Sequence, residues 1–188
     1  MEKPRANEKV KFRVFVIVVL LFFCGIFILY ISGTFGRPEA AVTKSGVGNV
    51  QVSDSSGLRE LESEYMRDTT NATLILSLAN RLSDAQSYMK AAGYYKKYLS
   101  INPGNADVWV DLGVCYYGLR DYAAAKESIS HGLKIDPKHQ IALLNMGIVS
   151  FAAGDREEAR SWWQKAAEAG EGTQTGIRAR ELLKSISK

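Results

Sequence analysis

The sequence predicts an all-α fold in which helix hairpins stack on one another behind one membrane-spanning helix. The segments 98–103 and 132–137 match in their order of apolar and polar residues, and each ends in a proline, Pro103 and Pro137. They define a period of about 34 residues, which is typical of a stacked helical repeat. Residues 14–31 form an apolar run without a charge, which is long enough for a transmembrane helix.

The period divides the centre of the chain into three units, 72–105, 106–139 and 140–173. Positions 8 and 20 of every unit hold alanine or glycine, where two helices of a hairpin can approach closely, and larger residues at positions 4, 7, 11 and 24 fill the space between hairpins. The small residues are Ala79, Ala91, Gly113, Ala125, Gly147 and Ala159.

This pattern resembles the tetratricopeptide repeat (TPR) family over the three units, although Glu171 stands where the family usually has proline. The resemblance implies a right-handed superhelical stack of three TPR helix hairpins. Asn105, Asp121 and Asp155 precede helical runs as N-caps. The predicted helices span 72–85, 88–101, 106–118, 122–135, 140–152 and 156–169, and residues 174–188 are predicted as a C-terminal capping helix with a polar outer face.

The chain before the repeats is predicted to have four parts. A basic tail at 1–13 precedes the transmembrane helix at 14–31, a flexible linker rich in glycine and serine follows at 32–57, and an amphipathic helix lies at 58–71. Because basic residues are concentrated before the span, the amino terminus is expected in the cytoplasm and the TPR domain on the other side, which in a bacterium is the periplasm. A cleaved signal peptide is the alternative, but its apolar run is usually shorter.

Leu58, Leu61, Tyr65 and Met66 share one face of the helix at 58–71. Such an apolar stripe predicts a helix that docks on the first repeat. The alternative is a helix that binds a partner or pairs with a second copy of the chain.

Charge and chemistry exclude several functions. The net charge of +4 lies mainly in the basic tail, and the remainder is close to neutral, so nucleic-acid binding is not expected. Cys24 and Cys115 are too isolated for a disulfide framework or a metal site. His131 and His139 are expected to be solvated. No catalytic, metal-binding or cofactor-binding residues are predicted, and the protein is not expected to be an enzyme.

In the TPR family the first helix of each hairpin lines a concave groove. Carried onto this chain, the resemblance implies polar lining residues towards the amino end, including Asp84 and Asp107, and an apolar strip further on. The predicted partner-binding residues are Asn80, Val110, Val114, Tyr117, Leu144, Asn145, Ile148 and Phe151.

Some TPR proteins grip the terminal carboxylate of a partner with lysines, an arginine and asparagines. Here only Asn80 fits that pattern, and the cationic residues are missing. The apolar strip suits an extended or helical peptide with hydrophobic anchors. Alternatively, the capping helix or the helix at 58–67 folds back and fills the strip.

The sequence therefore predicts a membrane-tethered module that binds a partner protein or peptide, as a scaffold or assembly factor. Two alternatives stay open. By analogy with similarly arranged proteins, the chain is an accessory factor of cytochrome c maturation or of the protein-export channel. Otherwise it is a structural membrane protein that self-associates into a homo-oligomer.

Overall fold

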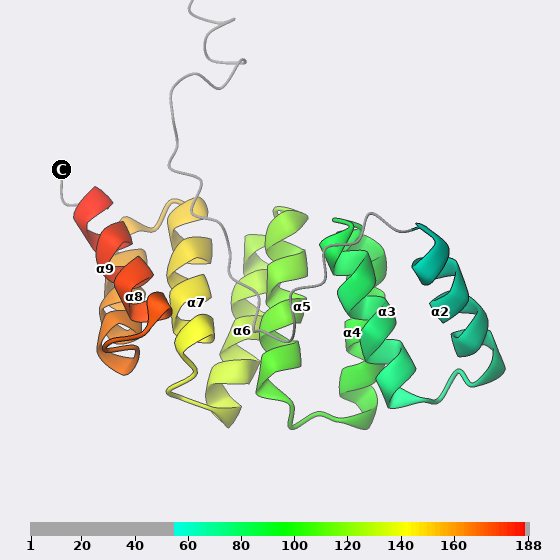
Figure 1. Cartoon of the computed structure of the whole chain (residues 1–188). Coiled ribbons are helices and arrows are strands. Elements are labelled where there is room, and N and C mark those ends of the chain that lie inside the picture. Colours follow the sequence, from blue (N-terminus) through cyan, green and yellow to red (C-terminus); the bar gives the residue numbers. More distant parts are fainter. Residues whose placement is uncertain (1–54, 187–188) are drawn as a thin grey trace, which may run out of the picture. The chain divides into compact units, whose positions relative to one another are not determined.

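The computed structural model describes residues 55–186, which belong to one compact unit. The described range consists of α-helices joined by short turns (Figure 1). The helices are α2 (Ser55–Arg67), α3 (Ala72–Asp84), α4 (Tyr88–Ile101), α5 (Ala106–Gly118), α6 (Tyr122–Ile135), α7 (Gln140–Ala152), α8 (Arg156–Ala169) and α9 (Gln174–Ile186).

The helices of the three hairpins confirm the predicted bounds to within one residue, and α9 confirms the capping helix. Helix α2 differs from the prediction because it begins at Ser55, inside the predicted linker, and ends at Arg67. None of the helices between Ser55 and Ile186 has the length and hydrophobicity that crossing a membrane requires. The predicted tail at 1–13, the predicted span at 14–31 and residues 32–54 of the predicted linker lie outside the described residues.

Each first helix is capped by the residue that ends the preceding unit. Asn71 and Asn105 accept backbone N–H bonds with their side-chain oxygens, and Thr173 Oγ1 accepts from Gly176 N at 3.2 Å. His139 takes this place before α7, where its Nδ1 accepts the amide hydrogen of Ala142 at 3.2 Å. The cap position therefore recurs once in every repeat, whichever polar side chain occupies it.

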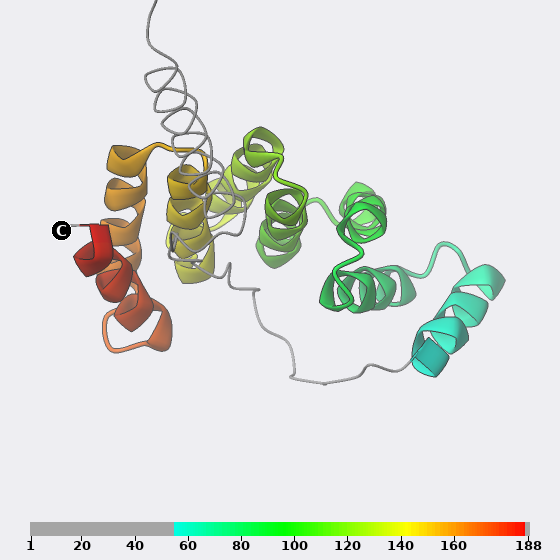
Figure 2. The ribbon, with the colours of Figure 1, turned by 90° about the horizontal axis from the view of Figure 1, so that it is seen from above.

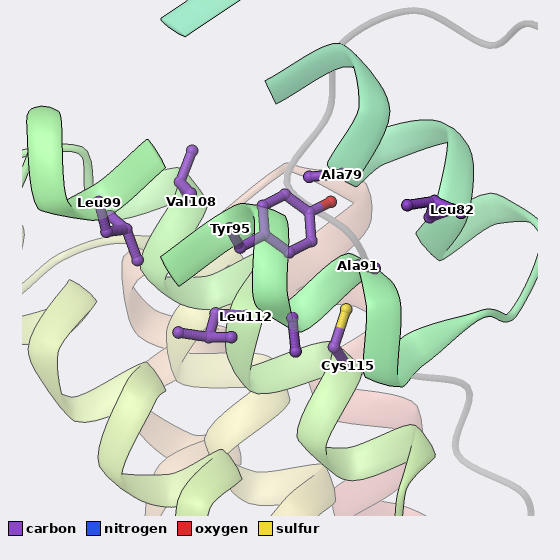
Figure 3. Close-up of a cluster of buried hydrophobic side chains, with 9 residues drawn as sticks. Ala79, Leu82, Ala91, Tyr95, Leu99, Val108, Leu112 and Cys115 are labelled. Carbon is purple, nitrogen blue, oxygen red and sulfur yellow. The ribbon is translucent and has the colours of Figure 1, made fainter. Parts of the chain in front are cut away.

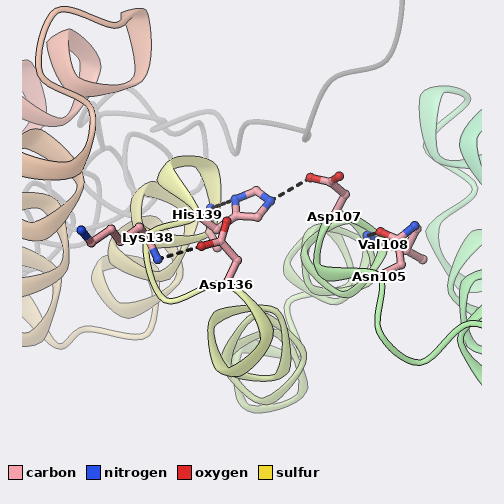
Figure 4. Close-up of polar contacts among 7 residues, drawn as sticks. Asn105, Asp107, Val108, Asp136, Lys138 and His139 are labelled. Carbon is pink, nitrogen blue, oxygen red and sulfur yellow. Dashed lines mark hydrogen bonds and ion pairs between the residues drawn. The ribbon is translucent and has the colours of Figure 1, made fainter.

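His139 is therefore not a solvated side chain, contrary to the prediction. Its Nε2 lies 2.8 Å from Oδ1 of Asp107 on the neighbouring hairpin, and Figure 4 shows the two side chains pointing towards each other. Since Nδ1 accepts a hydrogen bond, the ring proton belongs on Nε2, which donates it to Asp107. One neutral imidazole thus caps α7 and ties the second hairpin to the third.

The two predicted second-helix caps are also confirmed. Asp121 accepts from Ala124 N and Asp155 accepts from Glu158 N, both at 3.0 Å. A short side-chain oxygen at these places satisfies one of the amide groups that the first turn of a helix leaves unpaired.

Glycine at position 8 sets the distance between the helices of a hairpin. A Cβ atom at Gly147 would lie 2.4 Å from two atoms of the Trp163 indole, and one at Gly113 would lie 2.5 Å from Cγ1 of Ile129. Both large side chains are fully buried. The indole Nε1 of Trp163 donates to the carbonyl oxygen of Leu144 at 3.2 Å, so the ring fits against the backbone of α7.

Successive hairpins share their buried side chains. Figure 3 shows one such cluster, in which Tyr95 of α4 lies between Ala79 of α3 and Leu112 of α5. Cys115 belongs to the same cluster and is fully buried. A hairpin therefore buries its apolar surface against the next hairpin, as expected of a solenoid.

Four side-chain contacts between neighbouring units join residues that are 32 positions apart in the sequence, two fewer than the 34-residue repeat. This regularity shows that the stack keeps a single register from α2 to α8. The pairs are Tyr65 with Lys97, Ser83 with Cys115, Asp107 with His139, and Lys126 with Glu158.

Helices α2 and α9 continue this register as incomplete units. Helix α2 begins about one repeat before α4, so it stands where a second helix belongs, and α9 begins one repeat after α7, so it stands where a first helix belongs. The Tyr65 ring of α2 meets the Tyr94 ring of α4 edge-on at 5.4 Å, in the manner of neighbouring second helices. The described part of the chain is three hairpins between two half-units.

Both half-units turn polar residues outward. Helix α9 buries Ala179 and Leu182 against the third hairpin, whereas Glu181 and Lys184 are exposed. Helix α2 likewise exposes Glu64, and of its predicted apolar stripe Leu58, Leu61 and Tyr65 are half-buried whereas Met66 is 74% exposed. Polar ends stop further hairpins from stacking.

We predict opposite effects for alanine at two helical glycines. Gly147→Ala is expected to lower the free energy of unfolding by about 1–3 kcal/mol, because the added methyl group overlaps the rigid Trp163 ring. Gly93→Ala is expected to raise it by about 0.5–1 kcal/mol, because Gly93 is exposed and no atom lies within 4 Å of its added Cβ. Urea unfolding of both variants measures the difference, and equal effects would contradict the close packing at position 8.

His139→Ala is expected to lower the free energy of unfolding by about 1 kcal/mol because α7 loses its N-cap. His139→Asn keeps a capping oxygen and should remain within about 0.5 kcal/mol of the original chain. Lys138→Ala is the control, since this neighbouring side chain is exposed. If alanine and asparagine at position 139 behave alike in thermal unfolding, His139 is not a significant cap.

Candidate functional site

The first helices of the hairpins pack on one another: α5 contacts α7, and α7 contacts α9. Seen from above, the hairpins follow one another in a curved row (Figure 2). We call the surface of α3, α5 and α7 that points away from α4, α6 and α8 the inner face. It corresponds to the groove that the TPR resemblance predicts.

Four of the eight predicted groove residues are buried, which corrects the prediction. Val110, Leu144, Asn145 and Ile148 have at most 1% of their surface exposed. They are therefore not available to a partner on the surface of this structure.

Packing between neighbouring first helices explains this burial. Val110 of α5 belongs to a cluster with Ala142 and Met146 of α7. Leu144 and Ile148 of α7 belong to a cluster that includes Leu182 of α9. The capping helix therefore covers part of the predicted strip, as the self-filling alternative proposed, whereas α2 packs at the opposite end, on α3.

Helix α7 is buried all round at its centre. Every residue from Ala142 to Ser150 is buried, and the helix carries no charged residue. A helix that is apolar on all faces belongs in the interior of a protein. The absence of charge from 140–152 was the feature of the sequence that indicated burial of this part of the groove.

The other four predicted residues, Asn80, Val114, Tyr117 and Phe151, are half-buried. We call Val114, Tyr117 and Phe151 the apolar triad. It lies on α5 and α7, at the places that the resemblance assigns to the groove.

Aromatic contacts hold the triad in place. The Tyr117 ring lies 6.0 Å from the ring of Tyr122, and the Phe151 ring lies 5.7 Å from that of Trp163. The guanidinium group of Arg156 also lies 5.7 Å from the centre of the Phe151 ring. The triad is therefore a preformed apolar surface, which reduces the entropy lost when a ligand binds.

Asn80 has a structural contact in addition to its place on the inner face. Its Oδ1 accepts a hydrogen bond from the Tyr95 hydroxyl at 2.7 Å. Burial, and then the nearby Asp111 carboxylate, raise the pKa of Tyr95 well above its usual value. The phenol therefore stays a hydrogen-bond donor to Asn80 throughout the physiological range.

The residues that would bind a carboxylate in other TPR proteins are replaced here. Leu76, Asp111, Ile141 and Asn145 occupy the remaining places of that pattern, and none of them is a base. Asp111, the one charged residue among them, is an acid and is only 5% exposed. The inner face lacks the charge for this mode of recognition.

Two clefts lie away from the triad. One has a volume of about 340 Å³ and lies between α8 and α9, lined by Gln164 and Arg180 among others. The other has about 320 Å³ and lies beside His139 and Thr175. Over residues 55–186 no three His, Cys, Asp or Glu side chains are grouped so that they could hold a metal ion.

Sequence reasoning missed two histidine contacts. The first is the His139 cap, which its place one full repeat after Asn105 indicates. The second is His131, whose ring stacks on Trp109 at 4.5 Å. No pattern in the sequence pointed to that stack.

These helix hairpins, with their small residues at positions 8 and 20 and one register throughout, define a TPR protein. Residues 75–184 match the family described as the middle TPR-like domain of cilia and flagella-associated protein 70. This match covers more than half of the chain, and the chain belongs to that family.

Curated relatives share the repeats over part of their length. The protein O-mannosyl-transferase TMTC3 of Homo sapiens is 36% identical over 76 residues, which are 38% of this chain and 8% of that protein. The mitochondrial import receptor subunit TOM70 of Mus musculus is 28% identical over 133 residues, which are 70% of this chain and 21% of that protein. The chain thus spans a small part of both relatives.

A solved structure shows the same fold. The first TPR of Spaghetti (RPAP3), bound to the HSP90 peptide SRMEEVD, has a TM-score of 0.58 and 21% sequence identity. The match covers 64% of this chain and 93% of that one. At this identity the likeness establishes the fold and nothing further.

Proposed function

We propose that the inner face binds an extended segment of a partner protein, with the apolar triad as the contact surface. The observation that carries this proposal is the partial exposure of Val114, Tyr117 and Phe151, which stand on α5 and α7 at positions that line the groove in the TPR resemblance. Apolar and aromatic side chains that remain accessible in a well-packed domain are typical of binding surfaces.

The relatives support this function by analogy. RPAP3 binds a peptide with a TPR domain of the same fold, and TOM70 is a receptor subunit. This chain is expected to bind its ligand in a different way from TPR proteins that grip a terminal carboxylate, because the basic residues that hold the carboxylate are missing. The ligand is therefore an internal segment of a partner, held by side chains rather than by its end.

We further propose that the chain is membrane-tethered through residues 14–31, with the TPR domain on the non-cytoplasmic side. The uncharged run and the basic residues before it support this topology. A membrane anchor would raise the effective concentration of the binding surface for partners at the same membrane. Scaffolding or assembly of a membrane complex is the role that fits such an arrangement.

The proposed function contains no catalytic step. TMTC3 is a transferase, but the matching segment is a small part of it and consists of repeats in this chain. Stacking of many copies end to end is also not part of the proposal, since both half-units present polar outer faces. Turnover of a substrate by the full-length chain would contradict the non-catalytic assignment.

Charge placed in the triad should abolish peptide binding. The original chain is first used to select binding peptides from a displayed library of random dodecapeptides. Val114→Glu and Phe151→Glu are expected not to bind the selected peptides, because burying a carboxylate against an apolar anchor is unfavourable. Met89→Glu is the matched control, since Met89 is 74% exposed on α4. Circular dichroism verifies that each variant folds, and unchanged selection by folded triad variants would exclude the inner face.

A reporter enzyme that is active only outside the cytoplasm, fused after Lys188, is expected to be active in cells. Deletion of residues 14–31 should abolish that activity and release the protein from the membrane fraction, because the apolar run is removed. A fusion that is inactive while the protein remains in the membrane fraction would reverse the proposed orientation. A protein that is soluble with the run intact would exclude the anchor.

A further inference from the structure

One basic side chain lies directly at the apolar triad. Arg156 is the first residue of α8, and the central carbon of its guanidinium group lies 5.7 Å from the centre of the Phe151 ring. Phe151 and Tyr117 pack against the same buried cluster, which includes Leu144 and Ile148. Because Arg156 is exposed, it places a positive charge at the edge of the surface that is proposed to bind a ligand.

The acids next to Arg156 in the sequence contact other groups. Asp155 is the N-cap of α8 and accepts a hydrogen bond from Glu158 N at 3.0 Å. Glu157 forms an i,i+3 ion pair within α8 at 3.8 Å, and the Glu158 carboxylate pairs with Lys126 of α6. Within residues 55–186 the Arg156 guanidinium group has no hydrogen bond and no ion pair, so its N–H donors are available to a ligand.

The stability of α8 does not explain a base at its first residue. The amino end of a helix carries a partial positive charge, which favours acids in the first turn and disfavours bases. Glu157 and Glu158 follow this rule, whereas Arg156 does not. Its contact with the Phe151 ring offsets little of this cost, because a cation over an aromatic ring at an exposed site is only weakly stabilising. A ligand with a negative charge would account for the arginine.

We propose that the partner segment carries an aspartate or glutamate beside a hydrophobic anchor, and that Arg156 binds the carboxylate of this side chain. The inference rests on the proposed binding function of the inner face and adds a residue that determines its specificity. A guanidinium group can stack on an aromatic ring and still donate two parallel hydrogen bonds to a carboxylate. The anchor therefore contacts Phe151 while the acid next to it pairs with Arg156.

The dodecapeptides that the original chain selects from the displayed library test the charge of the ligand. Aspartate and glutamate are expected to be enriched at least about twofold within two positions of an apolar residue. The tightest-binding peptide is then synthesised with blocked ends, in its acidic form and with these acids replaced by asparagine or glutamine. Fluorescence anisotropy with the full-length chain is expected to show the amide form binding about threefold to fivefold more weakly at low salt, and by a smaller factor at high salt. Absence of enrichment, or equal binding of both forms, would overturn the inference.

Two variants of the chain locate the effect. Arg156→Gln is expected to bind the acidic and amide forms equally, within a factor of about 1.5, because the group that distinguishes them is removed. Lys134→Gln removes an exposed base from α6 and should keep the full difference between the two forms. Circular dichroism verifies that both variants fold. If Arg156→Gln keeps the difference, another residue binds the acid, and if it weakens both forms equally, Arg156 only covers the Phe151 ring; either result overturns the inference.

Failure of this inference and failure of the proposed function give different results. If the selected peptides lack acids and Val114→Glu abolishes their binding, the inner face binds apolar segments without regard to charge, and only the inference fails. If acidic peptides bind through Arg156 but Val114→Glu leaves them bound, the apolar triad is not the contact surface, and the proposed function and the inference both fail. If the chain selects no peptide, both are likewise overturned.

Discussion

The close approach of the two helices in each hairpin is the constraint on which the rest of the structure depends. Where Gly147 meets Trp163, a missing side chain on one helix makes room for a large one on the other. This arrangement buries a large aromatic side chain and fixes the spacing of the two helices in the hairpin. Because small residues recur at the same two positions of every repeat, the units stack in one register and their first helices share one face.

The fold was largely predictable because its determinants are local and periodic. Asn105, Asp121 and Asp155 mark helix starts directly, and the alternation of small and large residues marks the faces. The start of α2 was not predictable in the same way, since residues 55–57 have the composition of a linker and become helical beside the first repeat.

The candidate site was harder to predict than the fold. The same position of the repeat can be accessible in one unit and buried in another, depending on the neighbouring helix. Leu144 and Ile148 of α7, for example, pack in one cluster with Leu182 of α9. Position in the repeat therefore identifies a face, whereas exposure depends on what lies beside it. Among the apolar residues predicted to line the groove, the three that stay half-buried are those furthest towards the carboxyl ends of α5 and α7.

The two half-units also bear on how such a chain can change its length. Duplication of an internal block such as 106–139 would insert a hairpin whose caps and small residues match both neighbours, and the polar ends would stay as they are. Addition of a hairpin after α9 would instead place Glu181 where the complete hairpins hold glycine or alanine. Genetic growth of this domain is therefore expected from within, and each inserted block would lengthen the inner face while leaving its termini unchanged.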